Sequence, residues 1–238
     1  MGPILAKKYV LVRQDSSGSL AKDIRDKYKV GRNSVSILTP DGEVLARLTN
    51  EPAAEDVLAA VDGLPDFRVG MEQLAKLKEK GPTKANAESF AAALRRVGAF
   101  PSQESRETIL PYVKDESAPE AVQRAAILAL GKHPDAAAEV VRYLTDKRYA
   151  IKSAATTALT AMGPKALPAL FDALGSENVE VRAAAFGPAS ASTKNAKLAK
   201  ELGFWKTGKD DARAKALSEW RAWWEGQQTP KEDAKGKK

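Results

Sequence analysis

The second half of the chain contains VQRAAILALG at residues 122–131, IKSAATTAL at residues 151–159 and VRAAAF at residues 181–186. Each stretch begins with a β-branched residue, and these three anchors are 29 and then 30 residues apart. A fixed period of this size is typical of stacked helix pairs, because a single pair cannot bury its apolar face alone. The sequence therefore predicts an α-helical solenoid, an architecture that offers an extended surface to a partner.

Each repeat is predicted to consist of a helix, a short polar turn and a second helix. The predicted pairs are 104–114 with 120–131, 136–145 with 150–162, and 165–174 with 179–186. We expect Gly187-Pro188 to end the last of these helices early, because proline disrupts a helix interior. Alanines recur in the second helices at Ala126, Ala155 and Ala185. They predict that the two helices of each pair approach closely.

These stretches resemble HEAT repeats of the short bacterial type. The signature V-R-x-A-A-x-x-A-L-G is nearly complete at residues 122–131 and 151–159, and partial at 181–186. The resemblance implies an α-solenoid in which the basic residue after the anchor often pairs with an acid of a neighbouring turn. Lys152 and Arg182 occupy that position. For Arg182 we favour this structural role over ligand binding.

The end of the chain is rich in tryptophan, with all four tryptophans between residues 205 and 224. The spacing predicts a helix over residues 211–225 that places Leu217, Trp220 and Trp224 on one face. The ending resembles the W-x-x-W helix that closes many HEAT-containing proteins, which implies a cap over the last apolar face. The alternative is a DNA-reading surface, because basic residues flank the tryptophans.

The N-terminal segment predicts a strand at 9–12, a helix at 19–28, a β-hairpin from 34–39 and 43–48, and a helix at 52–64. KYKVG at residues 27–31 followed by ILTPDGEVL at residues 37–45 resembles the C-terminal half of a thioredoxin-like domain. Ser34 and Val35 align with that family's cis-proline and threonine, and the Cys-x-x-Cys unit has no counterpart. The resemblance implies a truncated, redox-inactive piece.

The predicted fold class is thus α+β and mainly α, with a partial thioredoxin-like α/β segment before the HEAT-like α-solenoid. We expect three regions: residues 1–66, a helical repeat domain at 71–225, and a disordered basic tail at 226–238. Residues 63–70 are predicted to form the linker between the first two.

The composition excludes several kinds of chemistry. The 238 residues include no cysteine and one histidine, His133, so thiol redox chemistry, thiolate zinc sites and multi-histidine metal sites are excluded. His133 is expected to be structural or solvated in a loop between repeats. The net charge is +7, and residues 191–238 contribute +5 of it through 12 basic and 7 acidic side chains. A basic end favours acidic partners, nucleic acid included, although a solubilising tail is the simpler interpretation.

We therefore predict a non-enzymatic protein-binding or scaffold module, with no catalytic, cofactor-binding or metal residues. The first alternative is a nucleic-acid-binding protein that uses its basic C-terminal third. The second is an accessory protein with a thioredoxin-type peptide groove beside Ser34. The candidate partner contacts are Lys152, Arg182, Trp205, Arg213 and Trp223.

Another protein is the expected partner, and nothing in the sequence sets the oligomeric state. No stretch is long and apolar enough to predict a membrane span. A cytoplasmic location is expected, or an exported one if a signal segment has been removed.

Overall fold

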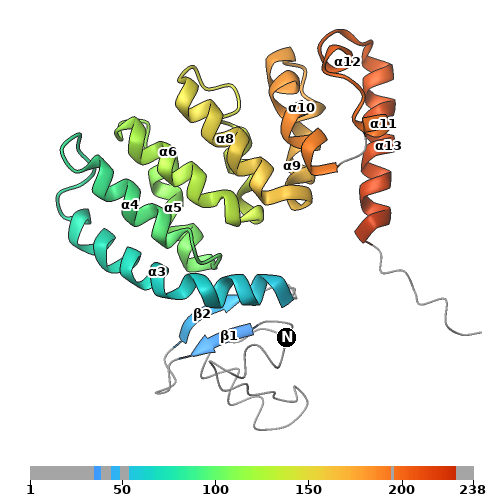
Figure 1. The fold of residues 1–238 in the computed structure, drawn as a ribbon. Coiled ribbons are helices and arrows are strands. Elements are labelled where there is room, and N and C mark those ends of the chain that lie inside the picture. Colours follow the sequence, from blue (N-terminus) through green and yellow to red (C-terminus); the bar gives the residue numbers. More distant parts are fainter. Residues whose placement is uncertain (1–34, 39–43, 49–53, 194–195, 229–238) are drawn as a thin grey trace, which may run out of the picture. The chain divides into compact units, whose positions relative to one another are not determined.

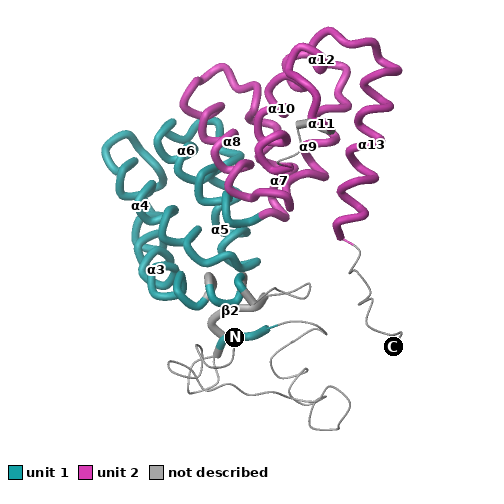
Figure 2. Tube along the Cα trace, turned by 45° about the vertical axis from the view of Figure 1, so that its right-hand side comes forward, with its two compact units in different colours: residues 1–133 teal, residues 134–238 magenta. Residues whose placement is uncertain are grey.

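The computed structural model describes residues 35–38, 44–48, 54–193 and 196–228, and these are mainly helical (Figure 1). They fall into two compact units, one ending at His133 and the other beginning at Pro134 (Figure 2).

The first unit begins with two antiparallel strands, β1 (Val35–Leu38) and β2 (Val44–Leu48). The register pairs Ile37 with Ala46 and becomes irregular between Ile37 and Leu38. Ile37 is buried, as the alternation of apolar and polar residues requires. The predicted pair of strands is therefore confirmed.

The thioredoxin-like interpretation also predicts further N-terminal elements. The strand predicted at 9–12, the helix predicted at 19–28 and Ser34 lie outside the described residues. The described residues show a hairpin followed by a helix, and this arrangement by itself does not make a thioredoxin-like α/β domain.

The predicted linker at residues 63–70 is wrong, because helix α3 runs without a break from Ala54 to Lys78. Its glycines serve helix packing. A Cβ on Gly63 would lie 2.1 Å from the carbonyl oxygen of Ala99, and a Cβ on Gly70 would lie 2.8 Å from the Cβ of Arg96. Glycine thus allows α3 to lie directly against the next helix. The boundary expected between residues 66 and 71 falls inside this helix.

The remaining helices of the first unit are α4 (Ala87–Val97), α5 (Gln103–Lys114) and α6 (Glu120–Ala129). α3, α4 and α6 lie side by side, and α5 packs against α6 from the other layer (Figure 1). Ser102 begins α5 with a capping box that it shares with Ser105. The fully buried core residues include Phe90, Leu94, Val97, Phe100, Ile109, Val113, Ile127 and Leu130.

The second unit continues the alternation of helices. Its longer helices are α8 (Tyr149–Met162), α9 (Leu167–Leu174), α10 (Val179–Thr193) and α13 (Asp210–Gln228). Three short helices accompany them: α7 (Ala137–Val141), α11 (Ala196–Ala199) and α12 (Leu202–Thr207). α10 packs against α8, α9 and α12, and α13 packs against α9 and α11.

The predicted helix pairs are largely confirmed, and the alanines expected to allow close approach (Ala126, Ala155 and Ala185) are fully buried. α7 is shorter than predicted, because residues 134–136 form a 3₁₀ turn before it and residues 142–145 form turns after it. The predicted helix over 211–225 is α13. Its last residues, 226–228, belong to the segment expected to be disordered, and the rest of that tail lies outside the described residues.

The expected early end of the last repeat helix is wrong, because α10 continues through Pro188 to Thr193. Tertiary contacts explain this outcome. Pro188 and Ala189 are buried, and the Thr193 hydroxyl donates to the Ala189 carbonyl at 2.7 Å. The indole of Trp220 in α13 in turn donates to the Thr193 hydroxyl at 3.0 Å. The capping helix therefore holds the segment that proline would otherwise interrupt.

Candidate partner-binding surface

The structure places one predicted contact, Trp205, in the core. Its side chain has 0 % exposure, and its indole Nε1 donates to the Ala199 carbonyl at 2.7 Å. Its ring lies 6.2 Å from that of Trp220, which in turn lies 5.3 Å from that of Phe171. The aromatic cluster seals the end of this unit, and Trp205 has no surface left for a partner.

Arg182 is also buried, with 5 % exposure. Its Nε donates to the Trp205 carbonyl at 2.8 Å, and its Nη1 donates to the carbonyls of Ser176 and Glu177 at 2.8 and 2.7 Å. The guanidinium therefore ties the turn after α9 to the last turn of α12. This is a structural role, as favoured from the sequence. However, the acceptors are backbone carbonyls instead of a turn acid, because helix ends leave carbonyls without intrahelical donors.

In the first repeat, Gln123 at the equivalent position also donates to a backbone carbonyl. It is fully buried, and its Nε2 donates at 2.8 Å to the carbonyl of Val113 in the last turn of α5. In the second repeat the equivalent Lys152 is exposed. The pKa of Asp146 is lowered, mainly by its hydrogen bond from Arg148, and the charge of Lys152 adds a smaller effect. Because its side chain is exposed, Lys152 is available to a partner.

The two other predicted contacts lie on or beside α13. Arg213 donates to the Gly208 carbonyl and pairs with Asp210, so its charge is partly neutralised at the start of the helix. Trp223 is half-buried and keeps part of its ring at the surface. Arg221 pairs with Asp172 at 2.7 Å and lies over the Phe171 ring. Two of the three basic residues of this helix, Arg213 and Arg221, are therefore paired with acids.

Sequence reasoning missed an exposed aromatic in the second unit. Tyr149 begins α8, one turn before Lys152, and its side chain is 83 % exposed. The sequence placed Tyr149 in the polar turn between two helices, where no spacing distinguishes a buried ring from an exposed one. Exposed tyrosine is enriched where proteins bind one another.

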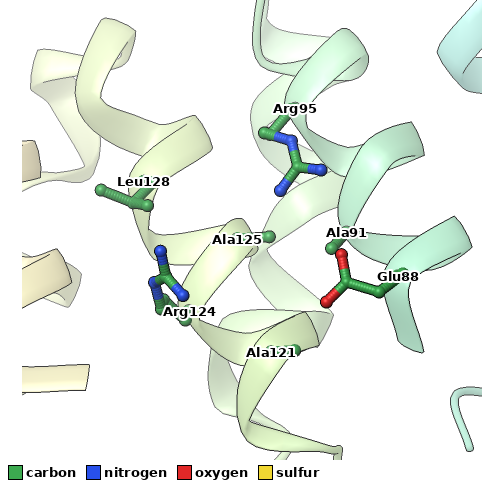
Figure 3. Close-up of a pocket in the computed structure, with 7 residues that line it drawn as sticks. All are labelled: Glu88, Ala91, Arg95, Ala121, Arg124, Ala125 and Leu128. Carbon is green, nitrogen blue, oxygen red and sulfur yellow. The ribbon is translucent and has the colours of Figure 1, made fainter. Parts of the chain in front are cut away.

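The first unit contains a shallow hollow of about 170 Å³ between the neighbouring helices α4 and α6 (Figure 3). Its lining consists of Glu88, Ala91, Arg95, Ala121, Arg124, Ala125 and Leu128. Figure 3 shows Arg95 and Glu88 pointing from α4 into the space between the helices. The hollow is smaller than the roughly 300–1,000 Å³ of ligand pockets, so its size suits a few side chains of a partner.

Part of this hollow could be inferred from the sequence. Phe90, Leu94 and Val97 recur at helical spacing and are fully buried in α4, and the same spacing places Arg95 on the exposed side. The same argument exposes Arg124 on α6. The sequence did not show that α4 and α6 are neighbours, because α5 separates them along the chain.

The only histidine is more deeply buried than expected. His133 has 2 % exposure, and its Nε2 lies 3.0 Å from the hydroxyl of Ser105. That hydroxyl lies 2.6 Å from the Phe100 carbonyl and donates to it, so His133 serves as the donor to Ser105. Burial, followed by the charges of Arg106 and Lys132, lowers the pKa of His133 to about 4. We assign this neutral pair a structural role, because Ser105 is fully buried and its proton is already donated.

Two other features are absent from the described residues. Those residues contain no group of three or more histidines, aspartates and glutamates that could hold a metal ion. No helix among them combines the length and the apolar character needed to cross a membrane.

The repeat pattern is matched by a known family. Residues 117–191 match the family model for HEAT repeats. The match begins in the turn before α6 and ends within α10, and it covers less than half of the 238-residue chain. No curated protein matches the chain. The HEAT assignment thus rests on the same three stretches that carry the 29- and 30-residue period.

Proposed function

We propose that this protein is a non-enzymatic scaffold that binds another protein through the exposed faces of its HEAT repeats. The observation that carries the proposal is the match of residues 117–191 to HEAT repeats, which commonly mediate protein–protein interaction. Two surfaces support it. One is the α4–α6 hollow with its two arginines, and the other is the start of α8 with exposed Tyr149 and Lys152.

The nucleic-acid alternative draws less support from the geometry. Its sequence basis was the basic C-terminal third, yet Arg213 pairs with Asp210 and Arg221 pairs with Asp172. A phosphate-binding surface instead needs unpaired cations that release counterions on binding.

The resemblance of the N-terminal segment to a thioredoxin-like piece is part of the scaffold proposal. A chain without cysteine would use such a piece for contact and not for disulfide exchange.

A pull-down with the full chain as bait tests the proposal. The lysate of the source organism is treated with nuclease and washed at about 50 mM and about 300 mM salt. We expect a protein that survives both washes and that binds the purified chain with a defined stoichiometry in calorimetry. Recovery of nucleic acid alone, lost at the higher salt concentration, would contradict the scaffold and favour the alternative.

A further inference from the structure

The α4–α6 hollow contains two cations that the described part of the chain leaves available. Arg95 and Arg124 are exposed, and neither forms an ion pair with another described residue. By contrast, three other described arginines, Arg148, Arg213 and Arg221, each pair with an aspartate. An arginine presents a planar fork of donors that matches a carboxylate.

The floor of the hollow allows a partner side chain to approach these cations. Ala91, Ala121 and Ala125 lie there, and their small side chains leave the space that the hollow occupies. Leu128 adds an apolar edge. A carboxylate that enters would thus be partly shielded from water, which strengthens its attraction to a guanidinium.

The charge pattern of α4 also constrains the partner. Glu88 and Arg95 line the same hollow and are seven residues apart, which corresponds to about 10 Å along a helix. A complementary segment therefore needs a basic group about 10 Å from its acidic group.

We propose that this hollow docks a segment of a partner protein that carries an acidic side chain against Arg95 and Arg124 and a basic side chain against Glu88. The proposal deepens the scaffold function and rests on it. It assigns the docking chemistry to residues of the first unit that the sequence did not single out.

The first test is a titration of the full chain, followed by NMR of the arginine Nε–Hε groups. The probe is a synthetic helical peptide of about 15 alanine-rich residues with one glutamate and one lysine seven positions apart. We expect the signals of Arg95 and Arg124 to shift, and a peptide with glutamine in place of glutamate to leave them unchanged. No shift of either signal up to about 5 mM peptide would overturn the proposal.

Charge reversal provides the second test. Arg95→Glu and Arg124→Glu should each weaken peptide binding by about tenfold. Arg142→Glu, at the exposed residue that directly follows α7, is the matched control and should bind as the wild type does. An unchanged unfolding midpoint would show that each variant is folded. Equal loss of binding in all three variants would overturn the proposal, because it would indicate general charge attraction.

The same variants separate this inference from the scaffold function. If the wild type retains a protein in the pull-down and both hollow variants retain it equally, the scaffold stands and the hollow is not its docking site. If the wild type retains none, the scaffold itself fails. Tighter binding of a single-stranded oligonucleotide than of the peptide, with shifts of the same arginine signals, would overturn the acidic-segment proposal in favour of nucleic acid.

Discussion

The residue after each β-branched anchor shows how one position of the repeat takes different roles. Gln123 and Arg182 are buried and donate to backbone carbonyls. Gln123 donates to Val113 in the last turn of α5, and Arg182 donates to Ser176 and Glu177 in the turn before α10. Lys152, at the same position of the middle repeat, is exposed. A side chain that satisfies buried carbonyls stabilises the fold, because those acceptors would otherwise lose their hydrogen bonds to water without replacement.

Replacing Arg182 tests this role directly. Arg182→Met should lower the free energy of unfolding by about 3 kcal/mol, because the carbonyls of Ser176, Glu177 and Trp205 lose a charged donor. Lys152→Met is the matched control and should change it by less than about 0.5 kcal/mol. Urea unfolding followed by circular dichroism measures both. Equal changes in the free energy of unfolding in the two variants would show that the hydrogen bonds of Arg182 do not stabilise the fold.

His133 should make the stability depend on pH. Its pKa is about 4 in the folded chain and 6.5 in its ordinary state, so between these values the unfolded chain binds more protons. Stability is therefore lost as the pH falls through this window, by about 2 kcal/mol at about pH 5 and about 3 kcal/mol below about pH 4.

The variant His133→Gln keeps a donor for Ser105 but does not titrate in this range. Urea unfolding at about pH 7 and about pH 5 should show a smaller loss for this variant than for the wild type. The difference between the two proteins isolates the histidine from the carboxylates, which titrate in both. Parallel pH profiles would disprove the contribution of His133.

At the scale of helices, glycine has two opposite roles in this protein. Gly63 lies inside α3, where an added Cβ would be 2.1 Å from the Ala99 carbonyl oxygen. Gly226 lies inside α13 and is exposed, and an added Cβ would meet no neighbouring segment within 4 Å. The first glycine sets how closely two helices pack, whereas the second only weakens its own helix.

The two glycines form a matched pair of substitutions to alanine. Gly63→Ala should destabilise the protein by about 2 kcal/mol or more, because α3 must move away from Ala99. Gly226→Ala should stabilise it by about 0.5–1 kcal/mol, because alanine has the higher helix propensity. Thermal unfolding by calorimetry measures both changes. A shift of the same sign in the two variants would refute this distinction.

At the scale of the whole molecule, each unit has a core of its own, and the second ends in an aromatic seal. Trp205 and Trp220 are fully buried in that seal, and Trp220 also binds Thr193 near the end of α10. In a repeat array each element depends mainly on its neighbours, so the terminal cap stabilises the adjacent repeat most strongly.

Removal of the cap should therefore have a local effect. Trp220→Ala should cost about 3–5 kcal/mol, and it should increase amide hydrogen exchange in α9, α10 and α12 far more than in α4. The half-buried Trp223 supplies the control, because Trp223→Ala removes much less buried surface. Hydrogen exchange with mass spectrometry resolves these segments. A uniform increase across all helices would contradict local coupling.

The candidate surface could be predicted only in part from the sequence. Helical spacing exposes Arg95 and Arg124, but the residues proposed as contacts were chosen from motifs, and two of them are buried. Arg182 was taken from the repeat signature, and Trp205 from the tryptophan-rich end of the chain. Burial is a property of the packed neighbours, so composition alone did not reveal it.

The fold, too, could be predicted only in part from the sequence. The period of the anchors and the alternation of residues 34–48 determined the helix pairs and the hairpin, because both depend on local spacing along one element. Only the tertiary structure decided that α3 continues through Gly63 and Pro65 and that α10 continues through Pro188. In each case contacts with another helix outweigh the local preference for a break, and those contacts join residues far apart in the sequence.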